Sequence, residues 1–199
     1  MRTPAIKSRP VYAGLQVNPH ARRTLFALQG EGAKALFEQV ERAGREFLTR
    51  SEVLFLAGNS VQHLAGLQQL APHLVRQAPN LDSLLQRLRD DLAIAKMGTS
   101  LQVAGTEGFI GQVLQVAMDS HIDAASICTE HRGSLARRVQ CVHCKQFTDG
   151  VTHSPFACSG CGLGLLVRDH YSRRLGAFQG VNVDAEAPGT APSLEELYP

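Results

Sequence analysis

Four of the five cysteines in this 199-residue chain lie in two Cys-x-x-Cys pairs. Cys141 pairs with Cys144, and Cys158 pairs with Cys161 after a short intervening segment. Two such turns can direct four thiolates at one centre, which is the tetrahedral ligand set of structural zinc. Gly162 suits the second turn because glycine tolerates positive φ. We therefore predict a zinc ribbon in which all four paired cysteines are metal ligands.

These cysteines allow three other interpretations. Two disulfides are disfavoured because residues 1–4, Met-Arg-Thr-Pro, do not begin a secretory signal, and disulfides are rare in the cytosol. Iron in an S₄ site would use the same ligands, and spacing alone does not separate it from zinc. A hydrolytic zinc is disfavoured because four thiolates leave no open coordination position. We expect a cytoplasmic protein with a structural metal.

The charge is unevenly distributed, although the net charge is only +2. Residues 131–180 carry seven basic and two acidic side chains, whereas residues 24–130 carry eight basic and twelve acidic ones. A basic ribbon beside an acidic body fits either nucleic acid or an acidic protein partner. The ribbon has few aromatic side chains to stack on bases, so we prefer a protein partner. No apolar run approaches 18 residues, so no membrane span is expected.

Apolar periodicity predicts the elements that precede the cysteines. Short apolar runs alternate with segments of helical spacing, and this alternation is typical of a parallel sheet covered on both faces. Asn80 is the expected cap of one helix. The expected strands are 24–28, 52–57, 100–104 and 124–128, with an ambiguous one near 74–75, and the expected helices are 33–40, 61–70, 81–92 and 109–117. The fold class is therefore α/β, a Rossmann-like sheet followed by a small zinc ribbon.

Glycine turns follow the first and fourth of these strands. Turns in those places bring backbone amides and helix N-termini to one sheet edge, where open α/β sheets bind anions and nucleotides. A nucleotide-free scaffold is the equal alternative, because Gln29-Gly30-Glu31-Gly32 lacks the full Gly-x-Gly-x-x-Gly pattern and Glu31 would bring a carboxylate near a phosphate. The candidate nucleotide-binding residues are Gly30, Gly32, Gly105, Glu107 and Gly108.

Composition suggests four parts along the chain. Scattered prolines without periodicity make residues 1–22 an extended arm, and residues 23–135 form the α/β domain. The ribbon covers residues 136–180. Residues 181–199 form an acidic tail that we expect to be extended.

Three segments of the α/β part resemble a known nucleotide-binding domain. Residues 29–33, 103–109 and 129–130 are similar to the glycine-rich turns and the last strand in the pyridine-nucleotide domain of ferredoxin-reductase-like proteins. This resemblance implies half a reductase, with NAD(P)H over the two glycine turns.

The ribbon resembles a second family. Residues 150–161, 167–177 and 181–188 are similar to the C-terminal zinc ribbon of DmmA-like subunits of bacterial dimethylamine monooxygenase. The resemblance implies a non-catalytic accessory subunit of an enzyme that converts dimethylamine to methylamine and formaldehyde with NAD(P)H and O₂. It places haem on a catalytic partner subunit, and flavin with an iron–sulfur cluster on a reductase partner. The alternative function is a stand-alone nucleic-acid-binding zinc-ribbon protein.

Overall fold

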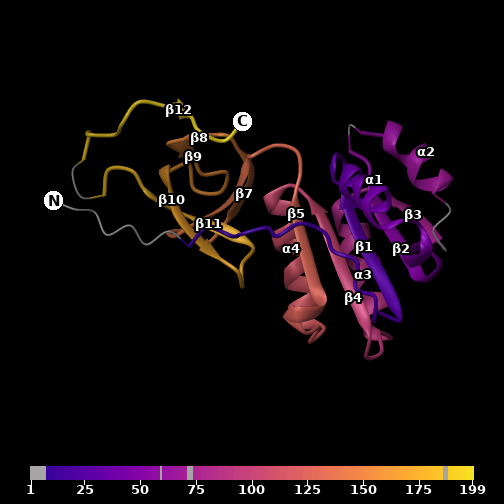
Figure 1. Ribbon diagram of the computed structural model, residues 1–199. Helices are drawn as coiled ribbons and strands as arrows, with labels where there is room; N and C mark the ends of the chain where they lie inside the picture. The colour runs from indigo at the N-terminus through magenta and orange to yellow at the C-terminus, as the bar shows by residue number, and fades with distance from the viewer. Residues whose placement is uncertain (1–7, 59, 71–73, 186–187) are drawn as a thin grey trace. The chain divides into compact units, whose positions relative to one another are not determined.

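The computed structural model describes residues 8–58, 60–70, 74–185 and 188–199 (Figure 1). The chain divides into two compact units. One unit comprises residues 12–133, and we call it the body. The other contains residues 134–199 together with the start of the chain up to Val11, and we call it the ribbon unit. Residues 1–7 of the predicted arm lie outside the described residues.

The body is built on five strands that are parallel throughout, in the order β3-β2-β1-β4-β5. This confirms the predicted Rossmann-like α/β fold. No helix in the described ranges has the length and apolar character needed to cross a membrane. The elements are β1 (Arg23–Gln29), α1 (Gly32–Ala43), η1 (Glu46–Arg50), β2 (Ser51–Leu56), α2 (Gln62–Gln69), β3 (Leu74–Ala78), α3 (Leu81–Ala93), β4 (Thr99–Gly105), α4 (Glu107–Asp119), η2 (Ala124–Ser126) and β5 (Ile127–His131).

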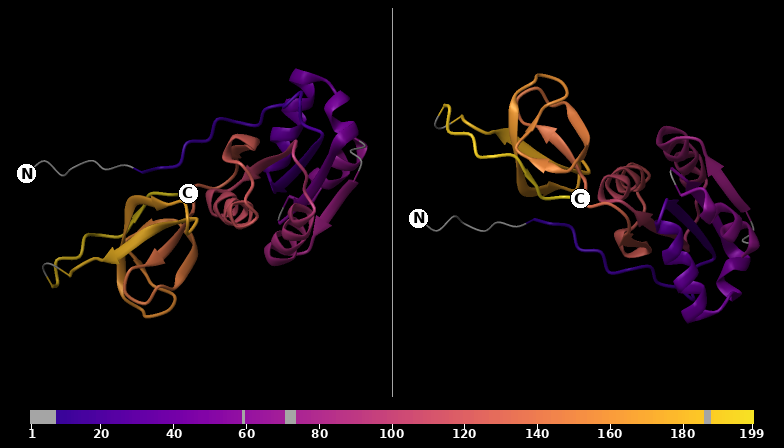
Figure 2. Two further views of the ribbon diagram at one scale, coloured as in Figure 1. Left: turned by 90° about the horizontal axis from the view of Figure 1, so that it is seen from below. Right: turned by 90° about the horizontal axis from the view of Figure 1, so that it is seen from above.

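Alternation along the strands divides the core into two layers (Figure 2). Leu25 and Ala27 of β1 pack with α3 and α4, while Phe26 and Leu28 pack with α1 and α2. Successive side chains of a strand point to opposite faces, so a run that is apolar at every position is what a doubly covered strand requires.

The last strand begins three residues later than the sequence predicts. Residues Ala124–Ser126 form a short 3₁₀ turn instead, because the Asp123 side chain accepts a hydrogen bond from the Ala125 amide. The strand then runs to His131, which pairs with Gly105 of β4. A capped turn has local polar partners that an apolar run does not reveal.

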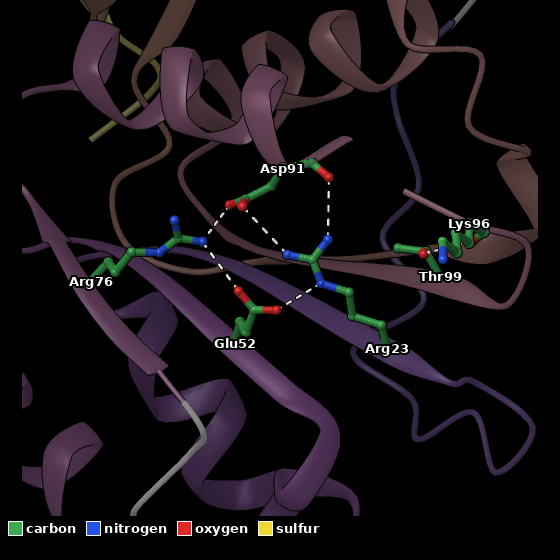
Figure 3. Close-up of polar contacts among 6 residues, drawn as sticks. All are labelled: Arg23, Glu52, Arg76, Asp91, Lys96 and Thr99. Carbon is green, nitrogen blue, oxygen red and sulfur yellow. Dashed lines mark hydrogen bonds and ion pairs between the residues drawn. The ribbon is translucent and has the colours of Figure 1, made fainter. Parts of the chain in front are cut away.

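Four charged side chains connect the first three strands to α3 (Figure 3). Arg23 contacts Glu52 (Nε–Oε1 2.7 Å) and Asp91 (Nη2–Oδ1 3.3 Å), and Arg76 contacts the same two carboxylates. We call these four residues the ion cluster. Its two positive and two negative charges cancel, so it joins these elements without leaving a net charge.

The ribbon unit contains a five-stranded sheet in the order β7-β6-β11-β10-β9, together with a β12-β8 pair. Strands β6 and β11 are parallel, and the other pairs are antiparallel. A small apolar core lies among them, made of Val139, Val151, Val167, Tyr171 and Phe178. The strands are β6 (Arg137–Cys141), β7 (Phe147–Val151), β8 (His153–Ser154), β9 (Phe156–Ala157), β10 (Gly164–Ser172), β11 (Ala177–Asn182) and β12 (Glu195–Glu196).

The end of the predicted acidic tail packs on the ribbon unit. Strand β12 pairs with β8, and the Leu135 amide donates to the Pro199 carbonyl at 2.7 Å. The buried Arg137 guanidinium lies between the rings of Phe178 and Tyr198, 3.9 and 4.0 Å from their centroids. The end of the tail is therefore held on the ribbon unit by a cation–π contact. The acidic composition of the tail does not predict this contact.

The predicted arm contributes to both units. In the ribbon unit, Ser8 forms an isolated parallel β-bridge with His170, and Arg9 forms an ion pair with Asp169. In the body, the Gly14 amide donates to the Thr129 carbonyl of β5 at 3.1 Å. The backbone of the described part of the arm thus hydrogen-bonds to β10 in the ribbon unit and to β5 in the body.

Candidate functional site

The four paired cysteines come together in the ribbon unit. The Sγ atoms of Cys141 and Cys161 are 3.9 Å apart, those of Cys144 and Cys158 are 3.6 Å apart, and all four lie within 4.8 Å of one another. Four sulfurs at about 2.3 Å from a tetrahedral zinc would be about 3.8 Å apart, so the spacing fits a single ion. A disulfide would need a separation of about 2 Å. The donor set thus fits a closed four-thiolate metal site.

Two similar turns position these sulfurs. After β6, Lys145 has φ +65° and its amide donates to the Cys141 carbonyl at 3.0 Å. After β9, Gly162 has φ +73° and its amide donates to the Cys158 carbonyl at 3.0 Å. The prediction that Gly162 adopts positive φ is confirmed.

Backbone amides favour the thiolate form at Cys158. The hydrogen bond from the Cys161 amide, followed by that from the Gly160 amide, outweighs desolvation and lowers the pKa of Cys158 to about 6. A Cβ atom at Gly160 would lie 2.8 Å from Gln146 Cβ and 3.3 Å from Cys144 Sγ. Only glycine therefore fits between the two turns. Cys141 and Cys158 are buried, and Cys144 and Cys161 are more accessible.

The glycines proposed for nucleotide binding lie at the carboxyl edge of the body's sheet, where they also allow close packing. A Cβ atom at Gly32 would lie 2.1 Å from the Ala104 carbonyl oxygen, so glycine lets the start of α1 approach β4. A Cβ atom at Gly105 would lie 2.8 Å from both Gln29 Cβ and Phe109 Cδ1. Gly30 has φ +49°, which favours glycine whatever the turn binds. These requirements explain the glycines without a nucleotide.

A carboxylate occupies the first glycine turn. Glu31 Oε1 accepts hydrogen bonds from Ser60 Oγ at 3.0 Å and lies 3.1 Å from His63 Nε2, while Oε2 lies 2.6 Å from Lys34 Nζ. The contact with Lys34, then those with His63 and Ser60, lower the pKa of Glu31 to about 2. The turn therefore holds an ionised carboxylate paired with Lys34, and the groups that could bind a phosphate here already contact that carboxylate.

The second turn is also bonded internally. Gln29 Oε1 accepts from the Thr106 amide at 3.1 Å and from the Thr106 hydroxyl at 2.8 Å. Glu107 Oε1 accepts from the Tyr12 hydroxyl at 2.9 Å, and the Tyr12 ring lies 5.9 Å from that of His131. The Gly108 carbonyl accepts from Gln112 within α4. An amide that already donates within the chain must break that bond before it can bind a phosphate oxygen.

Sequence reasoning identified the two glycine turns but not the side chains that bond to them. Tyr12 comes from the arm, Gln29 from the end of β1, and Ser60 and His63 from the connection into α2 and from that helix. They meet at one edge because the carboxyl ends of parallel strands lie together. No local motif marks them in the sequence.

Comparisons with known proteins match both parts of the chain. A family model for the N-terminal domain of dimethylamine monooxygenase subunit DmmA-like proteins matches residues 4–127, and the model for the C-terminal domain matches residues 138–181. The heme-dependent oxidative N-demethylase delta subunit of Ectopseudomonas mendocina (strain ymp) is 28% identical over 181 residues, which is 91% of each chain.

Solved structures give a weaker likeness. An intact type IV self-sufficient cytochrome P450 monooxygenase is 19% identical with a TM-score of 0.46, and full-length CYP116B46 from Tepidiphilus thermophilus is 17% identical with a TM-score of 0.44. Each alignment covers 67% of this chain, but this chain spans only 19% of either structure's length.

Proposed function

Because the chain belongs to the dimethylamine monooxygenase subunit DmmA-like family, we propose that it is an accessory, non-catalytic subunit of a multi-component oxidative N-demethylase. The observation that carries this proposal is the match to a demethylase delta subunit along 91% of both chains. A match over the whole length relates both units, rather than one shared domain, to that subunit.

The proposed substrate is dimethylamine, which the enzyme would demethylate to methylamine and formaldehyde with NAD(P)H and O₂. Haem would reside on a catalytic partner subunit, and flavin and an iron–sulfur cluster on a reductase partner. The proposed location of the assembly is the cytoplasm. Among the described residues, the one cluster of three or more potential metal ligands is the four-cysteine set. The 3.6–3.9 Å spacing of its sulfurs fits one ion better than an iron–sulfur cluster, which supports placing the proposed cluster on a partner.

The proposed metal is one structural zinc held by Cys141, Cys144, Cys158 and Cys161. The sulfur spacing of 3.6–3.9 Å and the amide bonds to sulfur support this assignment. A closed four-thiolate zinc supplies folding free energy and has no position for substrate. The metal would therefore shape the docking surface of the ribbon.

For the carboxyl edge of the body we propose a scaffold role, with weak or absent NAD(P)H binding by the free chain. The contacts of Glu31 with Lys34, His63 and Ser60, and the bond from Thr106 to Gln29, support this choice over a working nucleotide site. The alternative is a working nucleotide site, in which the pyrophosphate is held by Gly30, Gly32, Gly105, Glu107 and Gly108. Titration calorimetry with NADH and NADPH decides between the scaffold and the nucleotide site, because low-micromolar affinity in the free chain would favour the nucleotide site.

Co-expression with the neighbouring genes, followed by mass and metal analysis of the purified assembly, tests the function. We expect a complex that contains this chain, a haem protein and a flavin protein, with one zinc for each copy of this chain. Salt-dependent binding of oligonucleotides, without any such complex, would favour the nucleic-acid alternative.

A further inference from the structure

The connection between α3 and β4 displays two large apolar side chains. Ile94 is 72% exposed and Met97 is 96% exposed. Only a few large apolar side chains of the described residues are this open to solvent. Two of them within four residues form a small patch rather than scattered exposure, and such patches mark interaction sites when their surroundings are polar.

This connection has a fixed backbone. The Thr99 amide and hydroxyl both donate to the Lys96 carbonyl, at 3.1 and 2.8 Å, and close a turn. The Arg22 amide donates to the Gly98 carbonyl at 2.8 Å, which ties the turn to the start of β1. The patch is therefore presented on a pre-organised loop, which lowers the entropy cost of binding.

Positive charges outnumber negative ones around the patch, where Arg22 and Lys96 lie near one carboxylate, Asp123, which lines a pocket together with Lys96 and Met97. Arg22 and Lys96 are exposed, and in the described part of the chain neither forms an ion pair. The nearby carboxylates of Glu52 and Asp91 are already paired with arginines in the ion cluster, as Figure 3 shows beside Lys96 and Thr99. The local excess of positive charge thus remains available to a partner.

A hollow accompanies the patch. Its volume is about 310 Å³, and it is lined by Arg22, Arg23, Ile94, Lys96, Met97 and Thr99. This combination suits an apolar side chain that enters the hollow while carboxylates around it meet Arg22 and Lys96. Nucleic acid fits less well, because the two most exposed side chains of the loop, Ile94 and Met97, are apolar and offer no polar group to a phosphate backbone.

We propose that the Ile94–Met97 loop is a docking site for another demethylase subunit, which inserts an apolar side chain ringed by carboxylates. The proposal rests on the proposed function, since it takes the partner from the same enzyme. The loop belongs to the body, whereas the predicted docking surface of the ribbon belongs to the other unit.

The test uses full-length chain immobilised on a sensor, with the remaining subunits of the assembly, expressed without this chain, as the analyte. We expect Ile94→Ser and Met97→Ser each to weaken binding about tenfold, as for side chains at the centre of an interface. Lys96→Glu should slow association and reduce its dependence on salt. All three positions are exposed, so thermal melting of the variants should match wild type.

Matched controls come from exposed residues elsewhere in the body. Val61→Ser replaces another exposed apolar side chain, and Arg87→Glu reverses an exposed charge on α3. If wild type binds the other subunits and the loop variants bind them equally well, the docking site is wrong but the proposed function stands. Failure of wild type to bind any subunit would overturn the proposed function as well. Loss of a homodimer in the loop variants, seen by analytical ultracentrifugation, would show that a second copy occupies the patch instead.

Discussion

At the first glycine turn, the Glu31 carboxylate takes the contacts from Ser60, His63 and Lys34 that a bound anion could otherwise use. The sequence showed that a carboxylate would stand near any phosphate in this turn, and this part of the site was predictable. Lys34 lies only three residues further on, but Ser60 and His63 were not predictable, because they approach from the connection into α2 and from that helix. Their distance from Glu31 depends on how neighbouring strands pair.

The lowered pKa of Glu31 predicts how the stability of the body changes as the pH falls. Its pKa in the folded chain is about 2, below the ordinary value of 4.5, so its contacts stabilise the fold fully above about pH 4.5. This contribution is lost as the pH falls towards 2. Glu31→Gln should lower stability at neutral pH and flatten the decline between pH 4.5 and 2, measured by urea unfolding at each pH.

The matched control is Glu41→Gln, which changes an exposed glutamate on the same helix that forms no ion pair within the described residues. It should leave the acid profile as in wild type. Equal profiles for wild type and Glu31→Gln would mean that the contacts of Glu31 are not maintained in solution.

At the scale of elements, the order of strands and helices in the body followed from apolar periodicity. The glycine turns predicted where the chain passes from a strand into a helix. The alternation of strands and helices predicted the parallel sheet. The start of β5 did not follow, because the Asp123 cap competes with an apolar run for residues 124–126. The ion cluster was also hidden, since Arg23, Glu52, Arg76 and Asp91 are far apart in sequence.

The ion cluster fixes α3 against the first three strands, so removing one charge should loosen that contact. Asp91→Ala leaves Arg23 and Arg76 with one carboxylate between them. We expect the free energy of unfolding to fall by about 2 kcal/mol, less than for a fully buried pair because the side chains are 11–25% exposed. The neighbouring variant Asp90→Ala should change it by less than about 0.5 kcal/mol, because Asp90 is exposed. Similar losses in both variants, by urea unfolding, would contradict this account.

Strand β12 depends on the stack of Tyr198 against Arg137. Tyr198→Ala removes one of the two rings that cover the guanidinium and should lower the stability of the ribbon unit by about 1–2 kcal/mol. Tyr198→Phe keeps the ring and should behave like wild type. Hydrogen exchange of the amides in β8 and β12 measures the change. Equal protection in the Ala and Phe variants would show that the stack does not hold the strand.

At the scale of the whole molecule, the two units use different sources of stability. The body has two apolar layers on either side of its sheet, whereas the ribbon unit has a small core and the four-cysteine cluster. The sequence revealed this difference, since the paired cysteines are confined to one segment and the helical periodicity to another. It did not reveal that the chain on both sides of the body contributes to the ribbon unit.

Loss of the proposed zinc should therefore affect only one unit. Cys158→Ser should release the metal and unfold the ribbon, because metal binding supplies most of the folding free energy of so small a module. The helical circular dichroism signal of the body should persist. Limited proteolysis with mass analysis locates the cleavage, and unchanged resistance across residues 136–180 would contradict a structural metal. An absorption band from ferric thiolate in the wild-type chain would identify iron instead of zinc.

The stack of Arg137 between Phe178 and Tyr198 has a consequence for the order of events during translation. The body is one continuous stretch, residues 12–133, and all of it is synthesised before the second cysteine pair. Arg137 emerges early, but its second ring arrives only when Tyr198 does. The body is thus fully synthesised while the ribbon still lacks its closing strand, so the ribbon is the part that needs chaperones, and protection from proteases, for the longest time.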